Sequence, residues 1–216
     1  MPSALGKTSR SPFGVASSFI VCCLLLMVSC GGAPGQGGEL RSGDLLFVED
    51  AGSALGEAIS ASTGSYTHVA MVWRDSALWV VEATAPEGVR RVEYGEWMAG
   101  QRGRVVAMRP SVAVDTAALI ARAEAHLGEP YDSLYLPGNG AMYCSELVAE
   151  CMVDMAGRPL FSQSPMRFRD ESGELPPYWV DFYSGHGMAV PEGLPGTNPS
   201  GLAASPLLVR IGVSGK

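Results

Sequence analysis

Lysine is scarce in this chain, and long runs of positive charge are missing. Two lysines accompany thirteen arginines, and 22 acidic residues leave a formal net charge of −7 over 216 residues. Proteins that bind nucleic acid or an acidic membrane surface through charge carry clusters of basic side chains. The sequence therefore argues against a nucleic-acid partner and against a polybasic membrane patch.

The chain also lacks the residue spacings that hold a metal ion or a phosphate group. The three histidines are scattered, and the cysteines do not show the paired spacing of a zinc site. No glycine-rich loop follows a predicted strand and opens a helix, as a phosphate-binding loop would. We therefore predict neither a metal site nor a cofactor.

The composition is that of a globular chain. Hydrophobic residues make up 47% of the sequence and charged residues 17%, with 27 glycines and 15 prolines. These values exclude a disordered or fibrous protein, and the length suits one domain. We place that single domain at residues 40–216.

The N-terminus has the organisation of an export signal. Lys7 and Arg10 form a short positive region before a mostly apolar stretch from Phe13 to Val28. This stretch is short and interrupted by serine, so it does not predict a membrane-spanning helix. We assign residues 1–29 to a signal peptide that is no part of the fold.

The end of this signal resembles the processing site of bacterial lipoproteins. Ser29 and Gly31 flank Cys30, although Met27 stands where leucine is usual. In such proteins the cysteine becomes the acylated first residue of the mature chain. We therefore expect lipid on Cys30, a glycine-rich tether over residues 30–39, and a membrane-anchored protein on the periplasmic or cell-surface side. An ordinary signal peptide or an uncleaved anchor is the alternative.

Beyond residue 40 the pattern predicts an α+β fold. Short apolar runs predict strands over residues 43–48, 68–73, 78–83, 88–92 and 104–109. Capping residues and helical periodicity predict helices over residues 54–60, 96–99, 115–127 and 144–156. From residue 162 proline, glycine and aromatic residues predict irregular structure, with an irregular tail over 185–216 that could wall a cleft.

Only two of the five cysteines fall in the predicted domain, because Cys22 and Cys23 lie in the signal and Cys30 would carry lipid. Cys144 and Cys151 lie seven residues apart, about 10 Å along one helix. A disulfide needs Cα atoms within about 7 Å, so this pair cannot form one without unwinding the helix. An exported protein that keeps an unpaired thiol invites a chemical explanation.

Cys144 occupies the position of a nucleophile at the start of its predicted helix. It shares an apolar stripe with Leu147, Val148 and Cys151, so it faces the core. The positive end of a helix favours thiolate over thiol, and its free N–H groups can hold an oxyanion. The alternative is a small buried hydrophobic residue, a role that suits Cys151 better because it lies within the helix.

A nucleophilic thiol needs a base, and only histidine offers one here. His68 begins a predicted strand, where a rigid element would hold its ring. His126 lies near a helix C-terminus, where a surface cation suits the dipole, and His186 lies in a flexible stretch. We favour His68, although a histidine at a strand start can also be purely structural.

Glu82 lies inside an apolar strand, where a carboxylate is costly without partners. Paired residues of a hairpin keep a constant sum of residue numbers, so an odd-length loop is needed to put His68 and Glu82 on one face. A loop over residues 74–76 would pair Trp73 with Ala77 and set Glu82 directly opposite His68. With a two- or four-residue loop they would lie on opposite faces, and Glu82 could be an exposed carboxylate on an edge strand.

Four short motifs follow one another along the chain. They are Gly43-Asp44-Leu45-Leu46-Phe47, Thr67-His68-Val69, Val81-Glu82-Ala83 and Tyr143-Cys144-Ser145-Glu146-Leu147-Val148. Their order over roughly residues 40–160 resembles the YiiX-type cysteine peptidases, the circularly permuted branch of the NlpC-like, papain-like fold. In that branch the nucleophilic cysteine follows the histidine, as it does here.

The resemblance implies an antiparallel sheet packed against the helix that bears the nucleophile Cys144, with His68 as base and Glu82 as the residue that orients it. The implied activity is amide hydrolysis in small peptides of the cell envelope, with peptidoglycan stem peptides as natural targets. Tyr66, Tyr131 and Tyr143 flank the site and are candidate substrate contacts, although aromatic residues beside a cleft are as often packing residues.

Two other functions fit the sequence. The lecithin:retinol acyltransferase-like proteins share the order of histidine before cysteine and act on lipid acyl groups, but their cysteine motif differs. A non-catalytic module that binds a ligand in an ancestral cleft is the third hypothesis.

Overall fold

The structure is a computed structural model that describes residues 38–50 and 52–212. The predicted signal peptide and Cys30 lie outside the described residues. The strands are β1 (Leu45–Glu49), β2 (His68–Arg74), β3 (Leu78–Thr84), β4 (Gly88–Glu93), β5 (Arg104–Pro110), β6 (Ser164–Pro165), β7 (Pro195–Gly196) and β8 (Leu208–Arg210). The helices are α1 (Ala54–Thr63), α2 (Tyr94–Gly100), α3 (Thr116–His126), α4 (Cys144–Cys151), α5 (Pro177–Gly185) and α6 (Pro199–Ala203).

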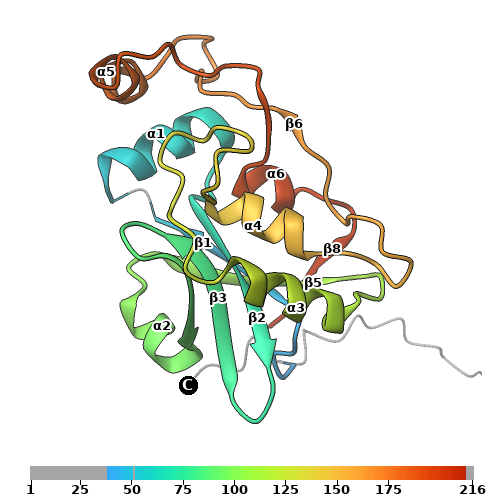
Figure 1. Cartoon of the computed structure of the whole chain (residues 1–216). Coiled ribbons are helices and arrows are strands. Elements are labelled where there is room, and N and C mark those ends of the chain that lie inside the picture. Colours follow the sequence, from blue (N-terminus) through green and yellow to red (C-terminus); the bar gives the residue numbers. More distant parts are fainter. Residues whose placement is uncertain (1–37, 51, 213–216) are drawn as a thin grey trace, which may run out of the picture. The chain divides into compact units, whose positions relative to one another are not determined.

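One antiparallel sheet organises the fold, as the α+β prediction requires. Its strand order is β4-β3-β2-β1-β5-β8, and β6 and β7 form a separate pair (Figure 1). Because successive side chains of a strand alternate between faces, β2 sends Val69 and Met71 into one core with Leu147 of α4. Ala70 and Val72 enter a second core with Trp97 of α2. Helices therefore cover both faces of the sheet.

The hairpin between β2 and β3 has the predicted odd-length loop, but the loop is shifted by one residue. Trp73 pairs with Trp79, so the loop spans residues 75–77 and not 74–76. The Asp75 side chain fixes this loop by accepting hydrogen bonds from the Ala77 backbone N–H (2.9 Å) and from Trp79 Nε1 (3.1 Å). Continued along β2, this register places Thr84 opposite His68. The expectation that Glu82 lies directly opposite His68 is therefore wrong: it is a diagonal neighbour on the same face.

Helix α4 ends earlier than predicted. It stops at Cys151, and not at Ala156, because the following residues form backbone bridges to other segments, Val153 to Pro159 and Asp154 to Val114. The Asp154 carboxylate also accepts hydrogen bonds from the backbone N–H groups of Ala156 and Arg158. These contacts bend the chain away from the helix axis.

The C-terminal segment is more ordered than its composition predicted. In place of an irregular tail over 185–216 the described part contains α6 and strand β8, which extends the main sheet by pairing with β5. Before it, α5 places Trp179 and Tyr183 in an aromatic cluster with Tyr135, Tyr143 and Phe168. The C-terminal segment therefore packs around the start of α4. In the described part of the chain, no helix has both the length and the hydropathy needed to cross a bilayer.

A buried ion pair holds the start of β1 against β5. Asp44, of which 1% is exposed, accepts two hydrogen bonds from Arg109, Nε to Oδ1 at 2.6 Å and Nη2 to Oδ2 at 2.7 Å. The Arg41 backbone N–H also donates to this carboxylate at 2.9 Å. At the other end of the same strand pair, Arg104 and Glu49 form an exposed ion pair (2.8 Å). The two pairs join the same strands in very different surroundings.

Arg109→Ala should therefore lower the free energy of unfolding by about 3 kcal/mol, because it leaves the Asp44 carboxylate buried without its cation. The matched change is Arg104→Ala, which removes the exposed ion pair with Glu49 on the same two strands. It should change the free energy of unfolding only slightly, because water replaces the lost contact. Urea unfolding followed by tryptophan fluorescence measures both. Equal losses in the two variants would contradict this account.

Candidate active site

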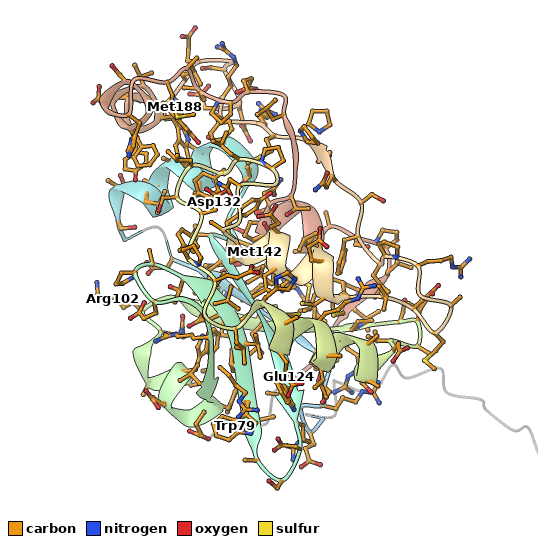
Figure 2. The ribbon with its side chains drawn as sticks, viewed as in Figure 1. Trp79, Arg102, Glu124, Asp132, Met142 and Met188 are labelled. Carbon is orange, nitrogen blue, oxygen red and sulfur yellow. The ribbon has the colours of Figure 1, made fainter. Side chains whose placement is uncertain are left out.

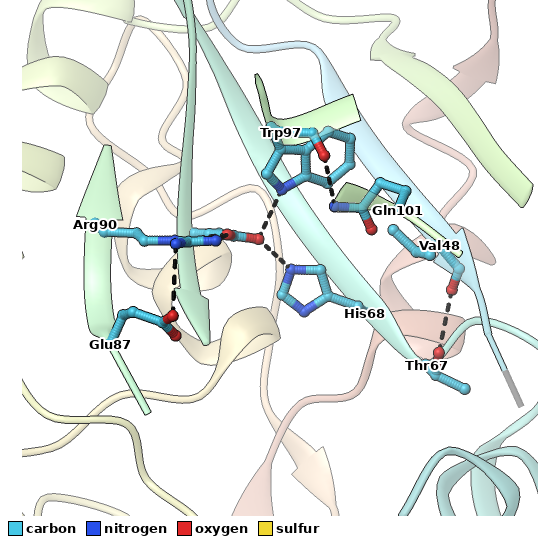
Figure 3. A network of polar contacts seen from close by, with 8 residues as sticks. Val48, Thr67, His68, Glu87, Arg90, Trp97 and Gln101 are labelled. Atoms are coloured by element: carbon cyan, nitrogen blue, oxygen red, sulfur yellow. Dashed lines mark hydrogen bonds and ion pairs between the residues drawn. The ribbon is translucent and has the colours of Figure 1, made fainter. Parts of the chain in front are cut away.

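A buried carboxylate, Glu82, collects hydrogen bonds from three directions. Its side chain is 3% exposed and accepts from His68 Nε2 (2.7 Å) and Trp97 Nε1 (2.8 Å) on Oε2. Oε1 accepts from Arg90 Nε (3.0 Å) and Nη2 (2.7 Å). Figure 3 shows His68, Trp97 and Arg90 converging on this point. Each carboxylate oxygen therefore has two donors, which is what a buried charge requires.

The local fold brings these donors together. Arg90 on β4 is directly paired with Glu82 on β3, so the ion pair is a cross-strand neighbour. Helix α2 begins immediately after β4, with Glu93 as its N-cap, and carries Trp97 back over the same face of the sheet. A tight hairpin and a short helix thus build most of the carboxylate's surroundings.

Contacts between the start of β2 and the end of β1 fix the position of His68. The Thr67 hydroxyl contacts the backbone carbonyl oxygens of Val48 (3.4 Å) and Asp50 (3.0 Å), which fixes the start of β2 against the end of β1 (Figure 3). The His68 side chain is 22% exposed. Because a carboxylate can only accept, Nε2 carries the proton in the bond to Glu82, and Nδ1 remains free for another partner.

Cys144 is close enough to His68 to raise the pKa of the imidazole. It is the first residue of α4, after Tyr143 as N-cap, and is buried in the same core cluster as Leu147, Val148 and Cys151. Both Cys144 and Cys151 are free thiols. Cys151 is fully buried within the helix, and burial raises its pKa to about 12, which suits a packing role.

The titration of His68 and Glu82 reflects their mutual contact. Burial by itself would lower the pKa of His68, but hydrogen bonds and charge from Cys144 and Glu82 raise it to about 10. Burial by itself would raise the pKa of Glu82, but His68, Trp97 and Arg90 lower it to about 2. At neutral pH the Glu82 carboxyl is therefore ionised, and the His68 ring is in its positively charged imidazolium form.

A second buried carboxyl lies in the first turn of α4. Glu146 is 8% exposed; it accepts a hydrogen bond from the Tyr143 backbone N–H, and its Oε2 has no partner among the described residues. Burial, with the charges of Asp132, Glu150 and Glu129, raises its pKa to about 7. Glu146 is thus partly neutral at physiological pH, which limits the negative charge beside Cys144.

Two hollows meet at this site. The larger has a volume of about 590 Å³ and is lined by His68, Glu82, Arg90 and residues of α1 and α2. The smaller has a volume of about 50 Å³ and is lined by Cys144 and by aromatic and apolar side chains of the C-terminal segment. Ile59, Thr67 and Tyr131 border both, so the two hollows are neighbours.

Residues 39–212 match the protein family described as permuted papain-like amidase enzymes, YaeF/YiiX, C92 family. The chain belongs to this family. It is therefore a cysteine peptidase or amidase, and its sheet and helices form the permuted papain-like α+β fold.

Two relatives fit this assignment. The uncharacterised protein YiiX of Escherichia coli K12 is 29% identical over 155 residues, which is 69% of this chain and 74% of that protein. A crystal structure described as metalloprotein yiiX from Escherichia coli O157:H7 has a TM-score of 0.68 at 23% identity and covers 81% of this chain and 97% of that one. Within the described residues of the present chain, no group of three or more His, Cys, Asp or Glu side chains is placed to hold a metal ion.

The three tyrosines predicted as substrate contacts have different places in this C92 enzyme. Tyr131 borders both hollows, and Tyr143 lines the smaller one while its hydroxyl accepts a hydrogen bond from the Thr197 N–H (3.0 Å). Tyr66 lines neither hollow: it packs on Phe47 and accepts a hydrogen bond from Arg210 (2.6 Å). Only the first two are placed to contact a substrate.

The loop before α4 sets the position of Tyr131. Asp132, labelled in Figure 2, accepts hydrogen bonds from the backbone N–H groups of Leu134 (2.9 Å) and Leu136 (2.7 Å). Gly88 touches the same loop so closely that a Cβ there would overlap the Glu129 carbonyl oxygen. Side-chain caps and a close backbone approach therefore fix the tyrosine beside the site.

The other two histidines lie away from both hollows. His126 donates from Nδ1 to Glu129 (3.0 Å) at the end of α3, and His186 donates from Nδ1 to the Phe182 carbonyl oxygen (2.8 Å). His126, expected as a surface residue, is partly exposed and paired with Glu129.

Sequence reasoning missed Arg90 and Trp97. Arg90 could have been found from the tight turn at Pro86, because a hairpin centred there pairs residue 90 with residue 82. No sequence pattern could have identified Trp97, because it lies on α2 and its partner Glu82 lies on β3.

The raised pKa of His68 should depend on both neighbours. In Cys144→Ala and in Glu82→Gln, the pKa of His68 should fall from about 10, because each change removes a group that stabilises the protonated ring. Titration of the imidazole C–H signals by NMR measures this. Cys151→Ala, which changes the other free thiol, should leave the titration in place. An unchanged His68 pKa in Cys144→Ala would show that thiol and ring do not interact.

Proposed function

We propose that this amidase cleaves its substrate with Cys144 as nucleophile, His68 as general base and acid, and Glu82 as the group that orients His68. The observation that carries the proposal is the 2.7 Å bond between His68 Nε2 and a fully partnered Glu82, on a ring whose protonation also depends on Cys144. A thiol, an imidazole and a carboxylate in this order are the parts of a catalytic triad.

The proposed reaction starts from an imidazolium–thiolate pair, in which His68, whose pKa is raised to about 10, already holds the proton of the Cys144 thiol on Nδ1. The thiolate attacks the amide carbonyl, and N–H groups in the first turn of α4 stabilise the resulting oxyanion. His68 then protonates the departing nitrogen, and the acyl group stays on the sulfur as a thioester. A water molecule, deprotonated by His68, attacks the thioester and releases the acid.

Glu82 supports these steps without touching the substrate. Its bond to Nε2 keeps Nδ1 directed at the thiol and stabilises the imidazolium form. Arg90 and Trp97 occupy its remaining lone pairs, so the carboxylate cannot turn away from His68. We propose Arg90 and Trp97 as positioning residues.

We also propose that the substrates are small amides or peptides of the cell envelope, met by a protein anchored through lipid on Cys30. The sequence around Cys30 supports export. Membership of a family of permuted papain-like amidases supports an amide over a lipid ester as the substrate.

The test of the proposed function is a covalent intermediate. The full-length protein, purified in mild detergent, is incubated separately with muropeptides and with phospholipids, and acyl adducts on Cys144 are sought by mass spectrometry. Muropeptides should give an adduct and a hydrolysed amide. Cys144→Ala should lose at least about 10³-fold of the rate while keeping its circular dichroism spectrum.

The matched control is Cys151→Ala, because it removes the other thiol of the same helix without reaching either hollow. It should retain activity. If only phospholipids gave an adduct, the protein would act on lipid acyl groups, and the proposal of amide cleavage would be wrong. Turnover that survives in Cys144→Ala would refute the triad, and the absence of any adduct or turnover would favour a binding module.

Anchoring should depend on one cysteine. In a bacterial host, Cys30→Ala should move the protein from the membrane fraction to the soluble or signal-retained form and abolish incorporation of labelled palmitate. Cys23→Ala, which changes a cysteine inside the predicted signal, should leave both unchanged. Palmitate labelling that persists in Cys30→Ala would show that another residue carries the lipid.

A further inference from the structure

We infer that the enzyme selects substrates with a small acyl side and a larger, polar leaving group, and that Met166 limits the size of the acyl side. This inference rests on the proposed function, because it assigns the two hollows to the two halves of the cleaved amide. The assignment follows from which catalytic atom borders which hollow.

The chemistry distinguishes the two sides. After the amide bond breaks, the acyl group remains bonded to Cys144 Sγ, so it must occupy the hollow that Cys144 borders. The departing nitrogen receives its proton from His68, so the leaving group lies on the side that His68 borders. Since Tyr131 and Thr67 border both hollows, the scissile bond lies between them.

The acyl hollow is narrow. Its volume of about 50 Å³ holds roughly three or four water-sized groups at about 15 Å³ each. A side chain of one to about three carbon atoms fits that space, whereas a long fatty acyl chain does not. The small volume of the hollow therefore disfavours lipid acyl substrates.

The walls of the acyl hollow come from two segments that are separate along the chain. Tyr135 and Tyr143 lie beside Cys144, and Met166, Phe168 and Trp179 close the hollow from the C-terminal segment. The aromatic walls are packed on one another, with ring centroids of Tyr135 and Trp179 5.9 Å apart and of Phe168 and Trp179 5.1 Å apart. A wall of buried rings that contact one another yields little to a larger substrate.

Met166 is the adjustable part of this wall. It is only partly buried and follows β6, and its backbone N–H bonds to the Leu194 carbonyl oxygen (2.8 Å). A Cβ at Gly196 would overlap the Met166 side chain and lie 2.8 Å from Tyr143 Oη, so the thioether is confined between the β6–β7 pair and the ring next to Cys144. Truncation of Met166 should therefore enlarge the hollow without removing a core side chain.

The leaving-group cleft differs in size and character. Its volume of about 590 Å³ is in the range of sites that hold an amino acid or a larger small molecule. Polar side chains line much of it, among them Asp50, Glu96 and Gln101. Within the described residues, neither Asp50 nor Glu96 forms an ion pair, so both can serve polar groups of a substrate.

The experiment uses probes that occupy only the acyl side. N-acetylalanine and N-acetylphenylalanine chloromethyl ketones alkylate a thiolate as chloride departs, and the thioether on Cys144 is located by mass spectrometry. Their rates on the full-length protein are divided by the rate of iodoacetamide, a size-neutral measure of thiol reactivity. The alanine probe should react at least about tenfold faster than the phenylalanine probe.

Met166→Ala should raise the ratio of phenylalanine to alanine rates by about tenfold, because the removed atoms make room for the larger side chain. The matched control is Met155→Ala, since Met155 is 68% exposed and borders neither hollow; its ratio should equal that of the wild type. The wild-type ratio is informative even if Met166→Ala folds poorly.

The outcomes separate the two proposals. If the phenylalanine probe labels wild-type Cys144 as fast as the alanine probe, the acyl assignment is overturned while the nucleophile stands. A ratio that Met166→Ala leaves unchanged in a folded protein removes Met166 as the size limit. If none of the reagents labels Cys144 in the native protein, the proposed function itself fails.

Discussion

The structure depends on one buried negative charge. Glu82 lies inside a sheet, where an unpartnered carboxylate would destabilise the fold by several kcal/mol. Its four hydrogen bonds come from His68 on β2, Arg90 on β4 and Trp97 on α2, so the charge links three elements. The same bonds that make the carboxylate tolerable also hold the imidazole in one orientation. Stability and the proposed chemistry therefore rest on the same contacts.

The proposed nucleophile and base come from opposite sides of the sheet. Even-numbered positions of β2 face α2, whereas α4 and Cys144 belong to the other core. The two groups meet because His68 is the first residue of β2 and Cys144 the first residue of α4, both at the edge of their elements. Two residues further along β2, the side chain would be enclosed in the core beneath α2, as that of Ala70 is. The early end of α4 does not affect this meeting, since only the start of the helix carries the thiol.

The C-terminal segment covers the start of α4. Strand β8 extends the main sheet by pairing with β5, while the segment that contains β6, α5 and β7 places aromatic side chains beside Tyr143. Thr197 fastens this cover through its N–H to Tyr143 and its hydroxyl to Ser145 (3.1 Å). Tyr143 and Ser145, the two neighbours of Cys144 in the chain, therefore also hold the C-terminal segment in place.

The sequence by itself determined where several helices and strands begin, and it put His68 and Glu82 on one face of the sheet. Helix caps at Ser53 and Asp115, the strand start at His68 and the helix start at Cys144 follow from local signals, and each lies where predicted. An odd hairpin loop placed Glu82 on the face of His68, a parity that survives a shift of the loop by one residue. Local pattern is enough here because neighbours within a turn of helix or a strand fix backbone geometry.

Only the tertiary structure decided the rest. The register of β2 against β3 depends on the Asp75 side chain in the loop between them. The bond from Trp97 to Glu82 depends on how α2 packs on the sheet, which no local sequence pattern predicts. The division into a wide polar cleft and a narrow hollow beside Cys144 arose from residues on separate segments of the chain, such as Tyr135 and Met166. Contacts of this kind depend on how whole elements pack, and no short window of sequence contains that information.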